Sequence, residues 1–126
     1  ASKALIESVD VFPTIAQIAG LPAPDGIDGQ SFANVIADPS SVARPYVTHV
    51  YPRSQQIGRA IRDSRYRMVQ WKVPGKPDDS AEIELYDYLE DPLETVNLAS
   101  TQPQVVQAML KLLAEHPEAK KPYRAK

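Results

Sequence analysis

Twelve prolines in 126 residues are the feature that most limits how this chain can fold. Proline fixes φ and lacks a backbone N–H, so it interrupts helix interiors and central strands. Only five glycines accompany the prolines, so the connections between elements are expected to be rigid. The sequence therefore predicts short helices and strands around one small core, because a chain of this length buries roughly two-thirds of its unfolded surface.

An amphipathic helix is predicted near the N-terminus. Apolar residues spaced by four and three positions form one helical stripe: Val11, Ile15 and Ile18. Ser8 or Asp10 can cap the start of this helix, and Gly20 can end it. Residues 4–6 resemble the end of a strand, and residues 31–37 are expected to form a second, short helix.

Four stretches rich in β-branched and aromatic residues predict an antiparallel sheet. They are residues 46–50, 57–62, 66–73 and 84–88. Pro52 is expected to end the first strand, and Asp63-Ser64-Arg65 is expected to form a tight turn between the second and third. A helix between Pro103 and Pro117 has a wide apolar face that can cover the sheet. The predicted fold class is therefore α+β.

Charge is unevenly distributed although the whole chain carries only −2. Residues 44–76 contain eight basic residues against the single acid Asp63, whereas residues 77–100 contain eight acids and no base. The two segments can fold against each other, so that their opposite charges are neutralised. Alternatively, the basic segment can form a face for an anionic partner.

Composition excludes several classes of protein. Cysteine is absent, which excludes disulfides, thiolate metal sites and a cysteine nucleophile within this sequence. No apolar run approaches the ~20 residues that a membrane-spanning helix requires, so a soluble chain is expected. Nucleic-acid binding is not expected, because the chain is acidic overall and does not interleave basic and aromatic residues on one face.

Four stretches resemble type I sulfatases in the same order. Residues 7–32 resemble the pattern VDLFPTLLELAGLPxPxGLDGxSL, and residues 84–99 resemble ELYDLxxDPxExxNLA. Residues 58–71 (GRAIRDSRYRMVQW) are similar to the hairpin GYSIRTxxYRYTxW of the iduronate-2-sulfatase branch, and residues 51–53 match a Tyr-Pro-Arg of that branch. The chain is thereby identified as a C-terminal part of a type I sulfatase of the alkaline-phosphatase-like superfamily.

The resemblance implies a division of the chain and a set of partners. Residues 1–40 would be the last strand and helix, with their connecting turn, of an α/β catalytic domain. Residues 41–126 would be the C-terminal antiparallel sheet and helix. The implied partners are the missing N-terminal catalytic part and a sulfated saccharide or other sulfate ester, with no nucleic acid and no membrane. Self-association through the exposed first helix is also expected. Family resemblance further implies a periplasmic, secreted or lysosomal location.

The family's reactive groups are not matched here. The resemblance implies calcium and a formylglycine for the parent enzyme, the latter made from the first residue of Cys/Ser-x-Pro-Ser-Arg. No stretch of this sequence matches that motif. The only Asp-Asp pair, Asp78-Asp79, lies in a polar loop and is interpreted as solvated. We therefore expect no catalytic residue, no metal ligand and no cofactor within this chain, and no activity of the chain by itself.

The candidate substrate contacts come from the hairpin region: His49, Tyr51, Arg53 and Arg59. A guanidinium group suits carboxylate and sulfate oxygens, and a strand that ends at Tyr-Pro-Arg would present side chains to the catalytic part. The alternative for Tyr51 and Arg53 is a structural role in a turn and an ion pair. The alternative for His49 is a structural histidine whose ring nitrogens are hydrogen-bonded within the fold. Arg59 and Met68 stand where the branch has tyrosine, so the substrate is expected to differ in detail.

Four further residues are predicted to be structural. Arg62 and Arg67 are expected to pair with acids such as Glu84 or Asp87. Trp71 and Tyr86 are expected to build the core beneath the last helix. His116 is expected to place a charge at the C-terminus of that helix.

Two functions of different classes remain open from the sequence. The first is part of a sulfatase, in which this piece completes the fold and helps wall the substrate pocket. The second is a free-standing, non-catalytic module that binds an anionic glycan or a protein through the arginine-rich hairpin.

Overall fold

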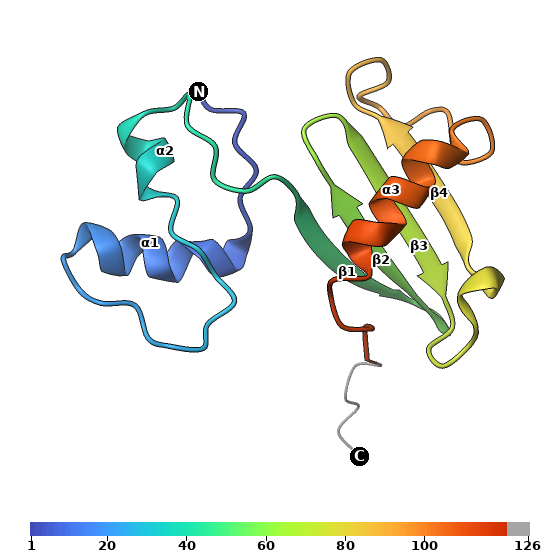
Figure 1. The fold of residues 1–126 in the computed structure, drawn as a ribbon, viewed down its shortest axis with the longest axis horizontal. Coiled ribbons are helices and arrows are strands. Elements are labelled where there is room, and N and C mark those ends of the chain that lie inside the picture. The colour runs from blue at the N-terminus through green and yellow to red at the C-terminus, as the bar shows by residue number, and fades with distance from the viewer. Residues whose placement is uncertain (121–126) are drawn as a thin grey trace. The chain divides into compact units, whose positions relative to one another are not determined.

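The computed structural model describes residues 1–120 (Figure 1). The chain forms two compact units, residues 1–47 and 48–126, which are described separately. The expected boundary after residue 40 refers to the domains of a longer enzyme and stays a prediction.

The first unit is helical. It contains a 3-10 turn, η1 (Ser8–Asp10), and the helices α1 (Val11–Ile18) and α2 (Ala33–Ala37). Gly20 has φ of 71° and follows α1, where its N–H bonds to the carbonyl of Gln17. This left-handed residue closes the helix as the sequence predicts, because glycine adopts positive φ without a Cβ penalty. The strand expected at residues 4–6 is wrong, since only one isolated bridge forms there, between Leu5 and Arg44.

Helix α1 buries its small and polar side and exposes its apolar stripe. Pro13, Thr14 and Ala16 are buried. The stripe predicted from the sequence is exposed by 45% at Val11, 61% at Ile15 and 64% at Ile18. An amphipathic helix normally turns its apolar stripe toward a core, so this stripe is a surface that can accept a partner.

The second unit is built on a four-stranded sheet in the order β1-β2-β3-β4. The strands are β1 (Val47–Arg53), β2 (Gln56–Arg62), β3 (Tyr66–Lys72) and β4 (Glu82–Asp87). The pairs β2–β3 and β3–β4 are antiparallel. Pro52 does not end β1 as expected. An edge strand tolerates a proline whose missing N–H is not needed in the ladder, and β1 lies at the edge.

The turn predicted at residues 63–65 forms, and the structure shows how. The Asp63 Oδ1 atom accepts the backbone N–H groups of Arg65 at 2.7 Å and Tyr66 at 2.6 Å. A side chain that bonds the backbone two residues ahead is typical of aspartate in turns. The loop before β4 contains one 3-10 turn, η2 (Asp78–Ser80).

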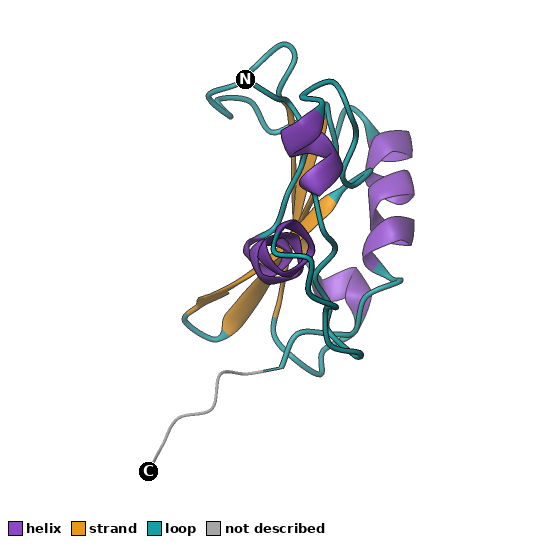
Figure 2. Ribbon diagram, turned by 90° about the vertical axis from the view of Figure 1, so that its left-hand side faces the viewer, coloured by secondary structure: helices purple, strands orange, loops and turns teal. Residues whose placement is uncertain are grey.

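Helix α3 (Pro103–Leu113) covers one face of the sheet. Figure 1 shows α3 across the front of the strands, and Figure 2, turned by 90°, shows it to one side of them. Val106, Met109 and Leu113 are buried, as are residues that the sheet directs to the same core: Ile57, Ile61, Met68 and Leu85. The predicted α+β arrangement of a small antiparallel sheet and a C-terminal helix is therefore confirmed.

Candidate functional site

The strand register assigns every side chain of the central strands to one of two faces. Gly58 lies opposite Trp71, Ala60 opposite Val69, and Arg62 opposite Arg67. Successive side chains point to opposite faces, so these six residues share the face that α3 does not cover. We call this surface the far face. Its continuation on β4 carries Glu82, Glu84 and Tyr86, which pair with alternate residues of β3.

A pocket of about 420 Å³ lies on the far face. Alternate residues of β1 line one side of it, namely His49, Tyr51 and Arg53. Trp71 and Glu84 contribute from β3 and β4, and the remaining lining residues are Gly58, Ala60, Arg67 and Val69. All three β1 side chains are exposed, with Tyr51 at 58%. The structure thus brings together three of the four candidate substrate contacts.

Arg59, the fourth candidate contact, lies on the opposite face. Its Nη2 atom donates to the backbone carbonyl oxygens of Leu113 at 2.8 Å and His116 at 3.0 Å. The last carbonyls of a helix lack partners within the helix, and a cation stabilises that end. Arg59 therefore caps the C-terminal end of α3, where a charge from His116 was expected, and lies apart from the other three candidates; its role as a substrate contact stays a prediction.

The basic and acidic segments neutralise each other at three places in the second unit. Arg65 Nη2 lies 2.7 Å from the carboxylate of Asp87, Arg67 Nε lies 2.5 Å from Glu94, and Lys72 Nζ lies 2.5 Å from Asp78. The hydrogen bond from Arg65 lowers the pKa of Asp87, which is buried. The reading in which the two segments fold against each other is confirmed for these pairs.

The predicted partners of Arg62 and Arg67 are wrong in detail. Arg67 pairs with Glu94 rather than with Glu84 or Asp87. Arg62 stacks over the ring of Tyr88, with its guanidinium carbon 4.0 Å from the ring centroid. The Nε atom of Arg62 is buried without a hydrogen-bond partner among the described residues.

Trp71 and Tyr86 do not lie beneath α3 as expected. Both are on the far face, where arginines stack on their rings: Arg53 is 5.5 Å from the Trp71 centroid and Arg67 is 5.5 Å from that of Tyr86. Smaller aliphatic residues and Met68 fill the core under the helix instead. The sequence did contain a signal for this. Glycine within a strand often marks a close approach of another group, and Gly58 lies directly opposite Trp71.

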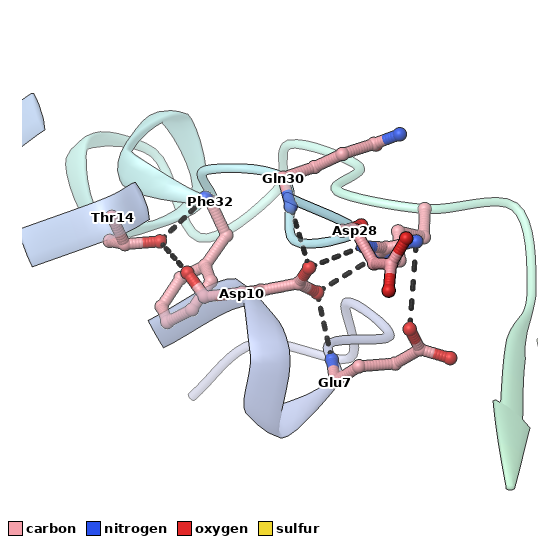
Figure 3. A network of polar contacts seen from close by, with 7 residues as sticks. Glu7, Asp10, Thr14, Asp28, Gln30 and Phe32 are labelled. Carbon is pink, nitrogen blue, oxygen red and sulfur yellow. Dashed lines mark hydrogen bonds and ion pairs between the residues drawn. The ribbon is translucent and has the colours of Figure 1, made fainter. Parts of the chain in front are cut away.

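A polar network holds the first unit together (Figure 3). Asp10 is 1% exposed, and its carboxylate accepts the backbone N–H groups of Glu7 and Gln30, each at 2.8 Å. Arg44 donates to both carboxylate oxygens of Asp10 and to the backbone oxygen of Asp28. Burial acts to raise the pKa of Asp10, but these hydrogen bonds outweigh it and the pKa is lowered.

Thr14 extends the same network to the next turn. Its hydroxyl donates to the backbone oxygen of Asp10 at 2.6 Å and accepts the N–H of Phe32 at 3.0 Å (Figure 3). Each polar group is satisfied within the unit, so we interpret the network as structural.

Residues 1–120 contain no group of three or more His, Cys, Asp or Glu side chains arranged to hold a metal ion. Asp78 is engaged by Lys72, and its pKa is lowered by that hydrogen bond. The residues described therefore do not fit the calcium site that the sulfatase resemblance implies for a parent enzyme. No helix in the same range is long and apolar enough to cross a membrane.

Comparison with known protein families decides the family. Residues 1–120 match the family model described as N-sulphoglucosamine sulphohydrolase, C-terminal. This chain belongs to that sulfatase C-terminal family. The chain is also 32% identical to an ulvan-active sulfatase of Formosa agariphila, covering 79% of this chain and 26% of that protein. It is 31% identical to arylsulfatase K of Xenopus laevis, covering 86% and 22%.

Solved structures give the same result for the fold of this sulfatase C-terminal domain. A putative sulfatase from Bacteroides thetaiotaomicron superposes with a TM-score of 0.68 at 26% identity, over 84% of this chain and 23% of that one. A protein solved in complex with its substrate D-glucosamine-2-N,6-O-disulfate superposes with a TM-score of 0.69 at 22% identity, over 84% and 22%. The chain spans about a quarter of the length of the relatives it matches. The iduronate-2-sulfatase branch expected from the sequence stays a prediction.

Proposed function

We propose that this chain is the C-terminal part of a sulfuric ester hydrolase that acts on a sulfated saccharide, and that the far-face pocket forms part of the substrate-binding wall. Membership of the sulfatase family supports the reaction class. The ulvan-active relative and the structural neighbour solved with a disulfated glucosamine support a saccharide substrate.

The observation that carries the proposal is the convergence of His49, Tyr51 and Arg53 in one pocket. Alternation along β1 points all three side chains to the same face. An imidazole, a phenol and a guanidinium supply the donors and acceptors that bind sugar hydroxyls and anionic oxygens. A volume of about 420 Å³ falls within the range of small-ligand pockets, roughly 300–1,000 Å³.

In this proposal the residues of this chain bind and orient the substrate. Arg53 would neutralise an anionic group, while Tyr51 and His49 would fix hydroxyls. Fixed geometry of this kind lowers the entropic part of the barrier. The formylglycine and calcium of the parent enzyme, its expected cofactors, would supply the nucleophile and the electrophilic stabilisation of sulfate elsewhere in the polypeptide.

Finer features of the parent are proposed on the same basis. We propose an iduronate-2-sulfatase-like substrate, a location in the periplasm, lysosome or outside the cell, and an N-terminal catalytic part as the main partner. The alternative, a free-standing module that binds an anionic glycan or a protein through the hairpin, has less support from the structure. Arg59, Arg65 and Arg67 are held by carbonyl or carboxylate groups, and Arg62 is stacked on Tyr88.

The test uses the full-length protein that contains this chain. Its KM and kcat are measured for release of sulfate from sulfated mono- and disaccharides, with Arg53→Ala and His49→Ala as variants. Each variant should raise KM or lower kcat. Lys76→Ala removes the same charge as Arg53→Ala from an exposed loop and should leave both constants unchanged. Unchanged kinetics in Arg53→Ala and His49→Ala would remove the pocket from the substrate wall.

A further inference from the structure

Among residues 48–120, Arg53 and Arg62 are the two arginines without a hydrogen bond to a carbonyl or carboxylate oxygen; Arg62 stacks on Tyr88 and does not line the pocket, whereas Arg53 does. Arg59, Arg65 and Arg67 each donate to a carbonyl or carboxylate oxygen. Arg53 has neither kind of partner among the described residues and lies over the ring of Trp71, 5.5 Å from its centroid. A guanidinium without an acidic partner at the rim of a pocket is available to an anionic ligand.

The Trp71 ring is held by its contact with the strand beneath it. A Cβ atom added at Gly58 would lie 2.6 Å from Cζ3, 2.8 Å from Cη2 and 2.9 Å from Cε3 of Trp71. Real Cβ atoms do not approach this closely, so any other residue at position 58 displaces the ring. The indole Nε1 is buried and has no hydrogen-bond partner among residues 1–120, so packing and not a hydrogen bond fixes the ring.

The pocket has opposite charges on its two sides. Arg53 is on β1 and Glu84 is on β4, three strands away in the sheet order. Neighbouring strands lie about 4.8 Å apart, which separates the two backbones by roughly 14 Å. Glu84 repels an anionic group and accepts hydroxyls, whereas Arg53 attracts an anionic group. Arg67 also lines the pocket, but Glu94 neutralises it, so an additional anionic group on a bound sugar is favoured at the Arg53 side.

We propose that Trp71 is a positioning residue. Its ring packs against Gly58 and holds the Arg53 guanidinium in place. The guanidinium then selects saccharides that carry a carboxylate or a second sulfate beside the sulfate ester that is cleaved. This inference rests on the proposed function and names the substrate class of the same pocket. Cation–π stacking orients the guanidinium without consuming its N–H donors, which remain free for anionic oxygens.

The test compares matched substrates in the full-length protein. One disaccharide carries a uronate beside the cleaved sulfate ester and its partner has the carboxyl group reduced to an alcohol. A second pair differs by the presence of a neighbouring sulfate. The variants are Trp71→Phe, Trp71→Leu and Gly58→Ala. Melting temperatures of all variants are measured alongside, so that a loss of fold is seen separately from a loss of selectivity.

The expected result is a change in KM that is largest for the doubly anionic substrates. Trp71→Leu and Gly58→Ala should raise KM for these substrates about 2- to 5-fold, the factor that an exposed cation–π contact is worth. KM for the singly anionic partners, which carry only the sulfate ester that is cleaved, should change less than KM for the doubly anionic substrates, because Trp71 and Gly58 also line the pocket. Trp71→Phe should retain most of the selectivity because phenylalanine keeps an aromatic face. The pair that shows the effect identifies whether Arg53 reads a carboxylate or a sulfate.

A double variant separates positioning from general packing. In a Trp71→Ala background, Gly58→Ala should have no further effect on KM, because no ring remains for the new methyl group to displace. Equal losses for doubly and singly anionic substrates, or equal effects of phenylalanine and leucine at position 71, would overturn the inference and leave the proposed function intact. Failure of the full-length protein to release sulfate from any of these substrates would overturn both.

Discussion

Arg67 and Glu94, 27 residues apart in the chain, form a two-point ion pair in which Nε–Oε1 and Nη2–Oε2 are both 2.5 Å. Glu94 also accepts a hydrogen bond from the hydroxyl of Tyr88 at 2.6 Å. The backbone of Glu94 has φ of 56°, a left-handed conformation that non-glycine residues adopt at a cost. The turn after β4 is therefore held in this form by its contact with β3.

Glu94→Gln should destabilise the second unit by about 2 kcal/mol, since it breaks charge-assisted hydrogen bonds to a partly buried arginine. Urea unfolding followed by tryptophan fluorescence measures this change. Glu90→Gln is the matched control, because Glu90 is exposed, and it should change stability by less than about 0.5 kcal/mol. Equal effects of the two variants would show that the Arg67–Glu94 ion pair contributes nothing to the free energy of unfolding.

The same pair predicts how stability depends on pH. Burial acts to raise the pKa of Glu94, but the hydrogen bonds from Arg67 and Tyr88 outweigh it and hold the pKa below its ordinary value of 4.5. A carboxylate with a lowered pKa in the folded state stabilises the fold above its unfolded pKa and loses this contribution as pH falls through the folded value. The difference in unfolding free energy between wild type and Glu94→Gln should therefore be constant from pH 7 to 5 and shrink below pH 4.5. A difference that stays constant down to pH 3 contradicts this explanation.

Asp10→Asn should loosen the first unit, because an amide cannot accept both N–H groups of Arg44 in place of the carboxylate. Removing one partner of a buried ion pair costs about 3–5 kcal/mol. Faster hydrogen exchange at Gln30 and Phe32, whose amides bond to Asp10 and Thr14, is the local measurement. Asp38→Asn is the control, since the Asp38 side chain is exposed and bonds to its near neighbours Ser40 and Ser41. Unchanged exchange in Asp10→Asn would exclude the network as the main support of this unit.

The exposed stripe of α1 should make the 126-residue chain associate with itself when no partner covers the stripe. Ile15→Ser combined with Ile18→Ser should lower the weight-average mass measured by sedimentation velocity at increasing concentration. Leu93→Ser removes an even more exposed side chain from the other unit and should leave the mass unchanged. A wild-type chain that is monomeric at all concentrations would contradict the expected association.

Elements with strong local signals could be predicted from the sequence. Gly20 ends α1, and Asp63 forms the turn between β2 and β3, because backbone conformation at these positions depends on the residue itself. The extent of β1 could not be predicted from Pro52, because whether a strand lies at the edge of a sheet depends on the tertiary pairing.

Which face of the sheet lies under the helix could not be predicted from alternation. Period-two spacing shows that Trp71 shares a face with Arg67 and not with Met68, but it does not tell which face α3 covers. The assignment of Trp71 and Tyr86 to the core failed for this reason. The partner of Arg67 was missed because eight carboxylates follow within one segment, and sequence position does not tell which of them the fold brings to Arg67.

Release of inorganic sulfate is the most direct test of the central claim, with the full-length protein and the 126-residue chain assayed side by side on the same sulfated saccharides. The account predicts release by the full-length protein and none by the chain alone, since this sequence contains neither a cysteine nor a match to the formylglycine motif. Sulfate released by the chain alone, or by neither protein on any of the saccharides, would contradict it.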